Sequence, residues 1–122
     1  MIEGVLLGES IRPGSELSGV PLVVKEIRRV RIDHPGPLQP SIWTLLLFEA
    51  DDSAAQPLAD ALAGCLLGEG GWYCDFQTAA EKFVVFGGRV FRYRRDDEAG
   101  HAAATGYGRS VGVPGPQLDW TR

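Results

Sequence analysis

The chain has 122 residues, of which 44% are hydrophobic and 23% are charged, and its formal net charge is −4 at pH 7. This length fits a single domain spanning residues 1–122, with a core large enough to fold without a metal ion or a disulfide. The acidic balance disfavours nucleic-acid binding, because proteins of that class present basic surfaces.

The location of the protein is also indicated by composition. No apolar run approaches the roughly 20 residues of a membrane span, and Met1–Gly4 lacks the basic side chains that open a secretory signal. We therefore predict a cytoplasmic protein in which Cys65 and Cys74 are reduced, buried thiols. No spacing of Cys and His residues suits a zinc site, so we expect neither a metal nor a cofactor.

Hydrophobic periodicity predicts six strands and two helices. The second strand changes its hydrophobic phase by one residue, which predicts a β-bulge near Arg28 and Arg29. The last two strands are joined by Gly87-Gly88, which is typical of a tight hairpin whose turn residues have positive φ. In chain order the predicted elements are strands 2–7, 20–32 and 42–49, a helix that ends at Gly68, strands 72–77, 83–86 and 89–93, and a helix from Asp96 or Asp97 to about Ser110.

The helices complete the predicted fold. The first begins after Ser53 or at Pro57, and its apolar stripe places Cys65 toward the core. The fold class is α+β: an antiparallel sheet of five to six strands, in the order β-β-β-α-β-β-β-α, with both helices packed on one face. After the second helix, Leu118 and Trp120 are expected to pack back onto the domain.

Several segments of the chain resemble those of a widespread set of small bacterial proteins with no known activity. The most distinctive is the closing run, which has the form YGxSxGVPxxQLDW. The resemblance covers about two thirds of the chain, implies a shared fold and carries over no chemistry. The segments concerned are Gly8–Ser10, Gly71–Phe76, Phe83–Phe86, Arg89–Phe91, Tyr107–Pro114 and Gln117–Trp120.

A small enzyme is the alternative interpretation of this chain. Its pocket would lie between the sheet and the second helix, with Asp75, Tyr107 or His101 as acid–base groups. The motifs do not favour this, because no serine lies in a nucleophile elbow, and Asp75 beside Cys74 opposes formation of a thiolate.

Aromatic residues form a second set of interest. Trp43, Trp72, Tyr73 and Phe76 are predicted to be either part of the core or the lining of a groove that receives a planar ligand or a partner side chain.

Arginines crowd the strand at residues 89–95. Arg92 and Arg94 share one phase of the strand, opposite Phe91 and Tyr93, so we predict that the aromatics face the helices and the arginines face the open side of the sheet. Two interpretations remain: a solvated face neutralised by nearby acids, or a binding surface at Arg92 and Arg94. We therefore predict a non-enzymatic binding or interaction module, whose open face meets a protein partner, a second copy of the chain or a small anionic ligand.

Overall fold

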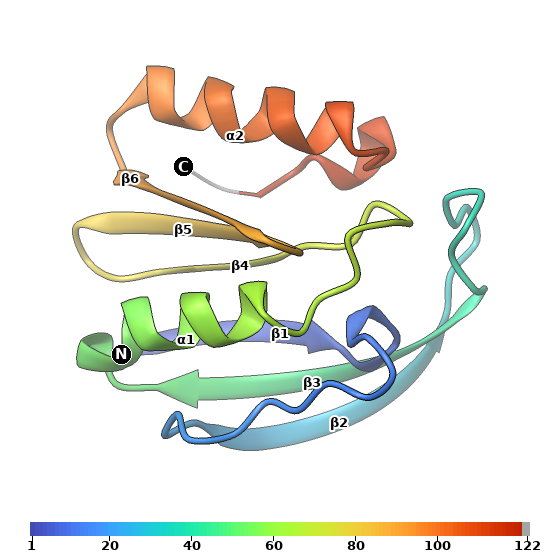
Figure 1. The fold of residues 1–122 in the computed structure, drawn as a ribbon, viewed down its shortest axis with the longest axis horizontal. Helices are drawn as coiled ribbons and strands as arrows, with labels where there is room; N and C mark the ends of the chain where they lie inside the picture. The colour runs from blue at the N-terminus through green and yellow to red at the C-terminus, as the bar shows by residue number, and fades with distance from the viewer. Residues whose placement is uncertain (121–122) are drawn as a thin grey trace.

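The computed structural model describes residues 1–120, which form two three-stranded antiparallel sheets and two α-helices (Figure 1). The first sheet has the strand order β1-β3-β2 and the second has the order β4-β5-β6. The α+β class and the order of elements are confirmed, but the six strands divide between two sheets. The elements are β1 (Ile2–Leu7), β2 (Val23–Arg31), β3 (Ile42–Ala50), α1 (Ala55–Ala63), β4 (Cys74–Gln77), β5 (Glu81–Phe86), β6 (Arg89–Arg94) and α2 (Glu98–Ser110).

The bulge in β2 explains why the hydrophobic phase of this strand changes. The register against β3 shifts between Val24, which pairs with Phe48, and Glu26, which pairs with Leu47. Lys25 is therefore the extra residue, three positions before the predicted bulge. A change of phase shows that a residue has been inserted, but several positions give the same pattern, so the sequence did not locate it.

Helix α1 lies between the two sheets (Figure 1). Its buried Leu58 and Leu62 share one core cluster with Phe48 of the first sheet and with Phe83 of the second. At the meeting of the sheets, β1 and β4 lie side by side, and the Cys74 thiol lies 3.5 Å from the backbone oxygen of Val5.

Both ends of α1 differ from the prediction. The helix follows a short 3-10 turn, in which the Asp51 side chain accepts the Ser53 N–H, so Ser53 is not the cap. It ends at Ala63 rather than near Gly68. Beyond the helix the chain instead bonds to the segment after β1, since the backbone oxygen of Cys65 accepts from the Arg12 N–H at 2.7 Å and the Leu67 N–H donates to the backbone oxygen of Ser10 at 2.8 Å.

Helix α2 packs on the opposite face of the second sheet, so the expectation that both helices share one face is wrong. Strand β5 is apolar on both sides: Phe83 and Val85 face α1, whereas Val84 and Phe86 face the cluster that contains Ala104 of α2. Both faces of this sheet must therefore be covered. Within residues 1–120, no helix has the length and apolar character needed to cross a membrane.

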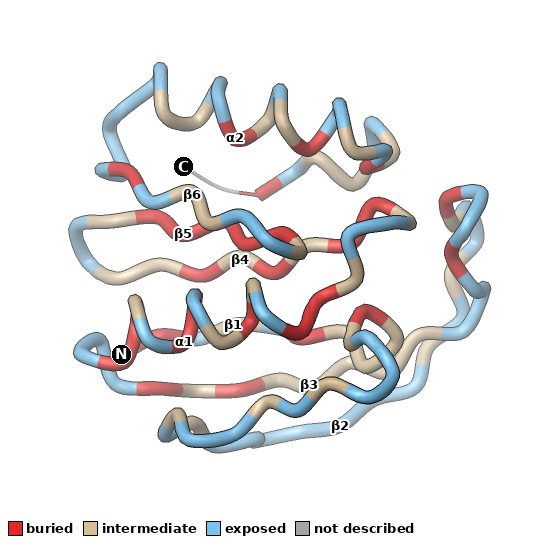
Figure 2. Tube along the Cα trace, in the orientation of Figure 1, coloured by how far each residue is buried: buried red, intermediate tan, exposed pale blue. Residues whose placement is uncertain are grey.

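The outer face of the first sheet, which points away from α1, has no helix over it in the part of the chain that the structure describes. Its central residues are partly exposed, and β2 at its edge is exposed along almost its whole length (Figure 2). We call this surface the open face; its central residues are Val5, Leu7, Trp43, Leu45 and Leu47.

A short turn after β1 ties this sheet together. Here the Glu9 carboxylate accepts hydrogen bonds from the Thr44 N–H at 2.6 Å and from the Thr44 hydroxyl at 2.8 Å. The side chain of Glu9 thus continues the pairing with β3 where β1 has ended. Burial opposes ionisation of this carboxyl, but the hydrogen bonds from Thr44 outweigh it and lower the pKa of Glu9.

Candidate functional site

The arginines of β6 do not lie on an open sheet face. Arg92 points to the α1 side, where its guanidinium binds the Glu81 carboxylate at 2.6 Å and the Gln56 side chain of α1 at 3.0 Å. Arg94 is 80% exposed and pairs with Asp96 at 3.4 Å. The prediction that the aromatic residues face a helix is confirmed, since Phe91 and Tyr93 pack in the cluster below α2. The prediction that the arginines face an open side of the sheet is wrong, because helices cover both faces of this sheet. A binding role for Arg92 and Arg94 stays a prediction.

The three acid–base candidates are not brought together. Asp75 lies on β4, whereas Tyr107 packs against Phe86 and His101 against Trp120. The cavities that border Asp75 are lined by neither Tyr107 nor His101. The predicted pocket below α2 is instead filled by the C-terminal tail, whose Trp120 is 7% exposed.

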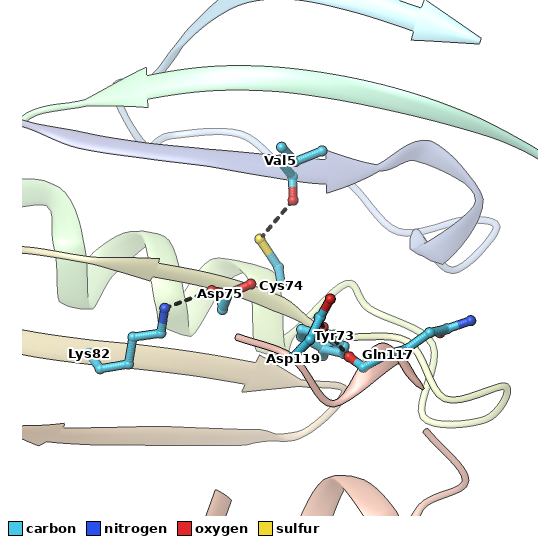
Figure 3. Close-up of polar contacts among 7 residues, drawn as sticks. All are labelled: Val5, Tyr73, Cys74, Asp75, Lys82, Gln117 and Asp119. Atoms are coloured by element: carbon cyan, nitrogen blue, oxygen red, sulfur yellow. Dashed lines mark hydrogen bonds and ion pairs between the residues drawn. The ribbon is translucent and has the colours of Figure 1, made fainter. Parts of the chain in front are cut away.

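A cavity of about 260 Å³ lies where the open face meets β4 and the C-terminal tail. We call it the junction cavity. Figure 3 shows how four of its residues, Tyr73, Asp75, Gln117 and Asp119, gather near the start of β4. The whole lining consists of Val5, Leu7, Trp43, Gly71, Trp72, Tyr73, Asp75, Gln117 and Asp119.

The apolar wall of this cavity is aromatic and held in place. The rings of Trp43 and Trp72 lie 5.3 Å apart between centroids, and Trp72 is buried. The Trp43 indole N–H donates to the backbone oxygen of Pro40 at 2.9 Å. What Trp43 offers a ligand is therefore the π-surface of its ring rather than its N–H.

The polar wall is anchored by an ion pair. The Lys82 ammonium, on a side chain that is 2% exposed, lies 2.7 Å from Oδ2 of Asp75, which is 32% exposed (Figure 3). The Tyr73 hydroxyl donates to the backbone oxygen of Gln117, and Asp119 lies 3.3 Å from the same hydroxyl. Burial, together with the charges of Asp75 and Asp119, raises the pKa of Tyr73 well above its usual value, so the phenol keeps its proton.

The cysteine beside this site is not an activated nucleophile. Cys74 directs its thiol toward Val5, and burial, with the nearby charge of Asp75, raises the pKa of the thiol far above its usual value. Both cysteines are free and buried, as expected. Neither histidine lines the junction cavity, so its described lining holds no nucleophile paired with a base.

The tail that closes the cavity is mostly structural. Leu118 packs against Gly108, and Trp120 is buried, so the prediction that both pack back onto the domain is confirmed. Gln117 exchanges two hydrogen bonds with Gln39, at 3.0 and 3.2 Å. Asp119, in contrast, is exposed. Sequence analysis singled out Trp43, Tyr73 and Asp75 for a site but not Asp119, which stood out only as part of the closing run and by its position between two apolar residues.

Comparisons with protein-family models, with curated proteins and with solved structures found no match to this chain. The resemblance of the closing run to small bacterial proteins therefore stays a prediction.

Proposed function

We propose that this protein is a non-catalytic interaction module that docks a segment of a partner protein on its open face. The observation that carries the proposal is the contrast between the two sheets. Among residues 1–120, the second sheet is covered on both faces, by α1 and α2, whereas the first is covered on one face only. An apolar sheet face that is left uncovered is typical of an interaction surface.

The open face is hollowed as well as apolar. Beside the junction cavity lies a second hollow of about 390 Å³, bordered by Val5, Leu47 and charged side chains. Val5, which is 42% exposed, borders both hollows, so the two adjoin on the open face, and we call them together the groove. A groove of this kind suits a chain segment with side chains at intervals better than a flat surface does.

Charge around the groove identifies the chemistry of the partner. Three of the acids are already paired with a base: Glu26 binds Arg28 at 2.6 Å, Glu49 lies 3.7 Å from Lys25, and Asp75 binds Lys82 at 2.7 Å. Acidic side chains nevertheless outnumber basic ones, and the chain as a whole has a net charge of −4. We therefore propose a partner segment with apolar side chains flanked by basic ones. The acids around the groove are Glu3, Glu26, Glu49, Asp75 and Asp119, and the bases are Lys25, Arg28 and Lys82.

Selection from a random displayed peptide library tests this function. Peptides that bind the folded protein should combine apolar and basic residues. Leu47→Glu should weaken their binding by about tenfold or more, because burial of the new carboxylate under an apolar side chain of the peptide costs more than its attraction to the flanking basic residues contributes. The matched control is Ala103→Glu, which adds the same side chain to the exposed surface of α2. Thermal melts should show that both variants are folded.

Two results would overturn the proposal. One is a set of selected peptides that bind Leu47→Glu as tightly as the parent protein. The other is a concentration-dependent dimer that Leu47→Glu dissociates and Ala103→Glu does not, since the open face would then belong to a second copy of this chain.

A further inference from the structure

We infer that the junction cavity receives the guanidinium group of an arginine side chain. The inference rests on the proposed function for the origin of that arginine, as part of the docked segment. The cavity itself can be tested with a small molecule, independently of any partner.

The size of the cavity sets the scale of the ligand. Its volume of about 260 Å³ lies below the ~300–1,000 Å³ typical of pockets that enclose drug-sized ligands. It is therefore small for a drug-sized ligand and large enough for one side chain of a larger partner.

The hydrogen bonds of the lining decide the chemistry of that side chain. The single proton of the Tyr73 hydroxyl is given to the backbone oxygen of Gln117. The side-chain amide of Gln117 both donates to and accepts from Gln39, and the Trp43 N–H is given to Pro40. These groups are engaged with their neighbours, whereas the carboxylates of Asp75 and Asp119 keep acceptor capacity for a ligand. A ligand that supplies donors fits these carboxylates.

Two carboxylates make that donor a cation. Asp75 extends into the cavity from β4, and Asp119 from the tail. Lys82 binds Oδ2 of Asp75, so it holds the carboxylate in place while a third of the side chain remains exposed. The neutral phenol of Tyr73 adds no charge. The charges of Asp75 and Lys82 offset each other, so Asp119 gives the site its net negative charge, which disfavours an anionic ligand.

Among cations, guanidinium matches the aromatic wall. It is planar, so it stacks on an indole ring while its edge donates to carboxylates, and it is more weakly hydrated than an ammonium group. Trp43 presents such a ring beside the carboxylates. The same geometry gives a lysine side chain fewer hydrogen bonds and no stacking.

The test is a titration of isotope-labelled protein, followed by NMR, with N-acetyl-arginine methylamide. Its neutral isostere, N-acetyl-citrulline methylamide, and the lysine analogue serve as comparison probes. The arginine probe should shift the Trp43 indole resonance, assigned with Trp43→Phe, and the amides of Asp75 and Asp119 in a saturable way. We expect binding of the citrulline probe to be weaker by about tenfold, and that of the lysine probe to lie between the two.

Substitutions separate a site from a general effect of charge. Asp119→Asn removes one charge from an exposed side chain. It should weaken binding of the arginine probe by a few-fold and leave binding of the citrulline probe unchanged. The matched control, Asp60→Asn, makes the same change on the exposed surface of α1 and should alter neither. Equal binding of arginine and citrulline, shifts that map away from the cavity, or equal effects of the two Asn variants would overturn the inference.

Failure of this inference can be told from failure of the proposed function. If selected peptides bind the open face but the arginine probe does not enter the cavity, the inference is wrong and the function stands. If the probe binds in the cavity but Leu47→Glu has no effect on selected peptides, the cavity is a cation site and the docking function is wrong.

Discussion

Lys82 and Asp75 form an ion pair in which the two partners differ in burial: the lysine side chain is 2% exposed and the aspartate 32%, with 2.7 Å between Nζ and Oδ2. The two side chains extend from neighbouring strands, since Asp75 pairs with Val84 and Lys82 with Gln77. Such an arrangement fixes the position of a partly exposed carboxylate by means of a buried cation.

Removal of Asp75 and removal of Lys82 should therefore destabilise the protein to different extents. Asp75→Ala removes the carboxylate that lies 2.7 Å from a buried ammonium, and we expect it to lower the free energy of unfolding by about 2–4 kcal/mol. Lys82→Met keeps the buried volume and leaves a carboxylate that water reaches, so it should cost about 1 kcal/mol or less. Urea unfolding of both variants measures the difference, and a larger loss in Lys82→Met would contradict this account.

The carboxylate of Glu9 should make stability depend on pH. Its pKa is lowered in the folded state by the hydrogen bonds from Thr44, which outweigh the effect of burial. Its contribution is therefore fully present above the unfolded pKa of about 4.3 and is lost as the pH falls through the lower, folded pKa. Glu9→Gln should cost about 1–2 kcal/mol at pH 7, and its stability should converge with that of the parent as the pH falls below about 4. Unfolding curves at several pH values test this, with Glu69→Gln, on an exposed loop, as the control; a constant difference at all pH values would show that the charge of Glu9 is irrelevant.

The two glycines of the β5–β6 turn are required for different reasons. The sequence predicts positive φ at both, but only Gly88 has it, at +78°. At Gly87 the constraint is space, because an added Cβ would lie 2.6 Å from the backbone oxygen of Leu66. We expect Gly88→Ala to cost about 1 kcal/mol, and Gly87→Ala to cost more, about 2–3 kcal/mol, since neighbouring backbone must move. Thermal or urea unfolding shows which substitution destabilises the protein more. A larger loss of stability in Gly88→Ala would mean that backbone conformation dominates at both positions.

Local signals predicted most of the elements. The bounds of β1 are those expected from its apolar pattern, and Asp97 caps α2, with its side chain accepting the Gly100 N–H at 3.0 Å. Apart from α1, the predicted bounds agree with the structure to within three residues. These features depend on neighbours in the sequence, which is why pattern and capping residues reveal them.

Tertiary arrangement was harder to predict. Alternation in β6 correctly separated Phe91 from Arg92, but it cannot say which side a helix will cover, and here both sides are covered. It also cannot show that β1 and β4 lie side by side without a shared ladder. The same limit applies to the site: Trp43, Tyr73 and Asp75 stood out by residue type, whereas Asp119 reaches them only because the tail folds back across β4.

The tail supplies the last prediction, because it has both a structural and a binding role. Trp120 is buried against Phe86 and Tyr73, so deletion of residues 117–122 removes core contacts as well as Asp119. This deletion should lower the free energy of unfolding by about 3 kcal/mol or more, as loss of a buried large aromatic does. Asp119→Asn should leave the melting temperature within about 2 °C of the parent, because exposed substitutions change stability little, yet it should weaken binding of the arginine probe. Differential scanning calorimetry beside the NMR titration separates the two roles. A deletion that melts like the parent protein would show that the tail does not stabilise the fold in solution, and the position of Asp119 at the cavity would then lose its structural basis.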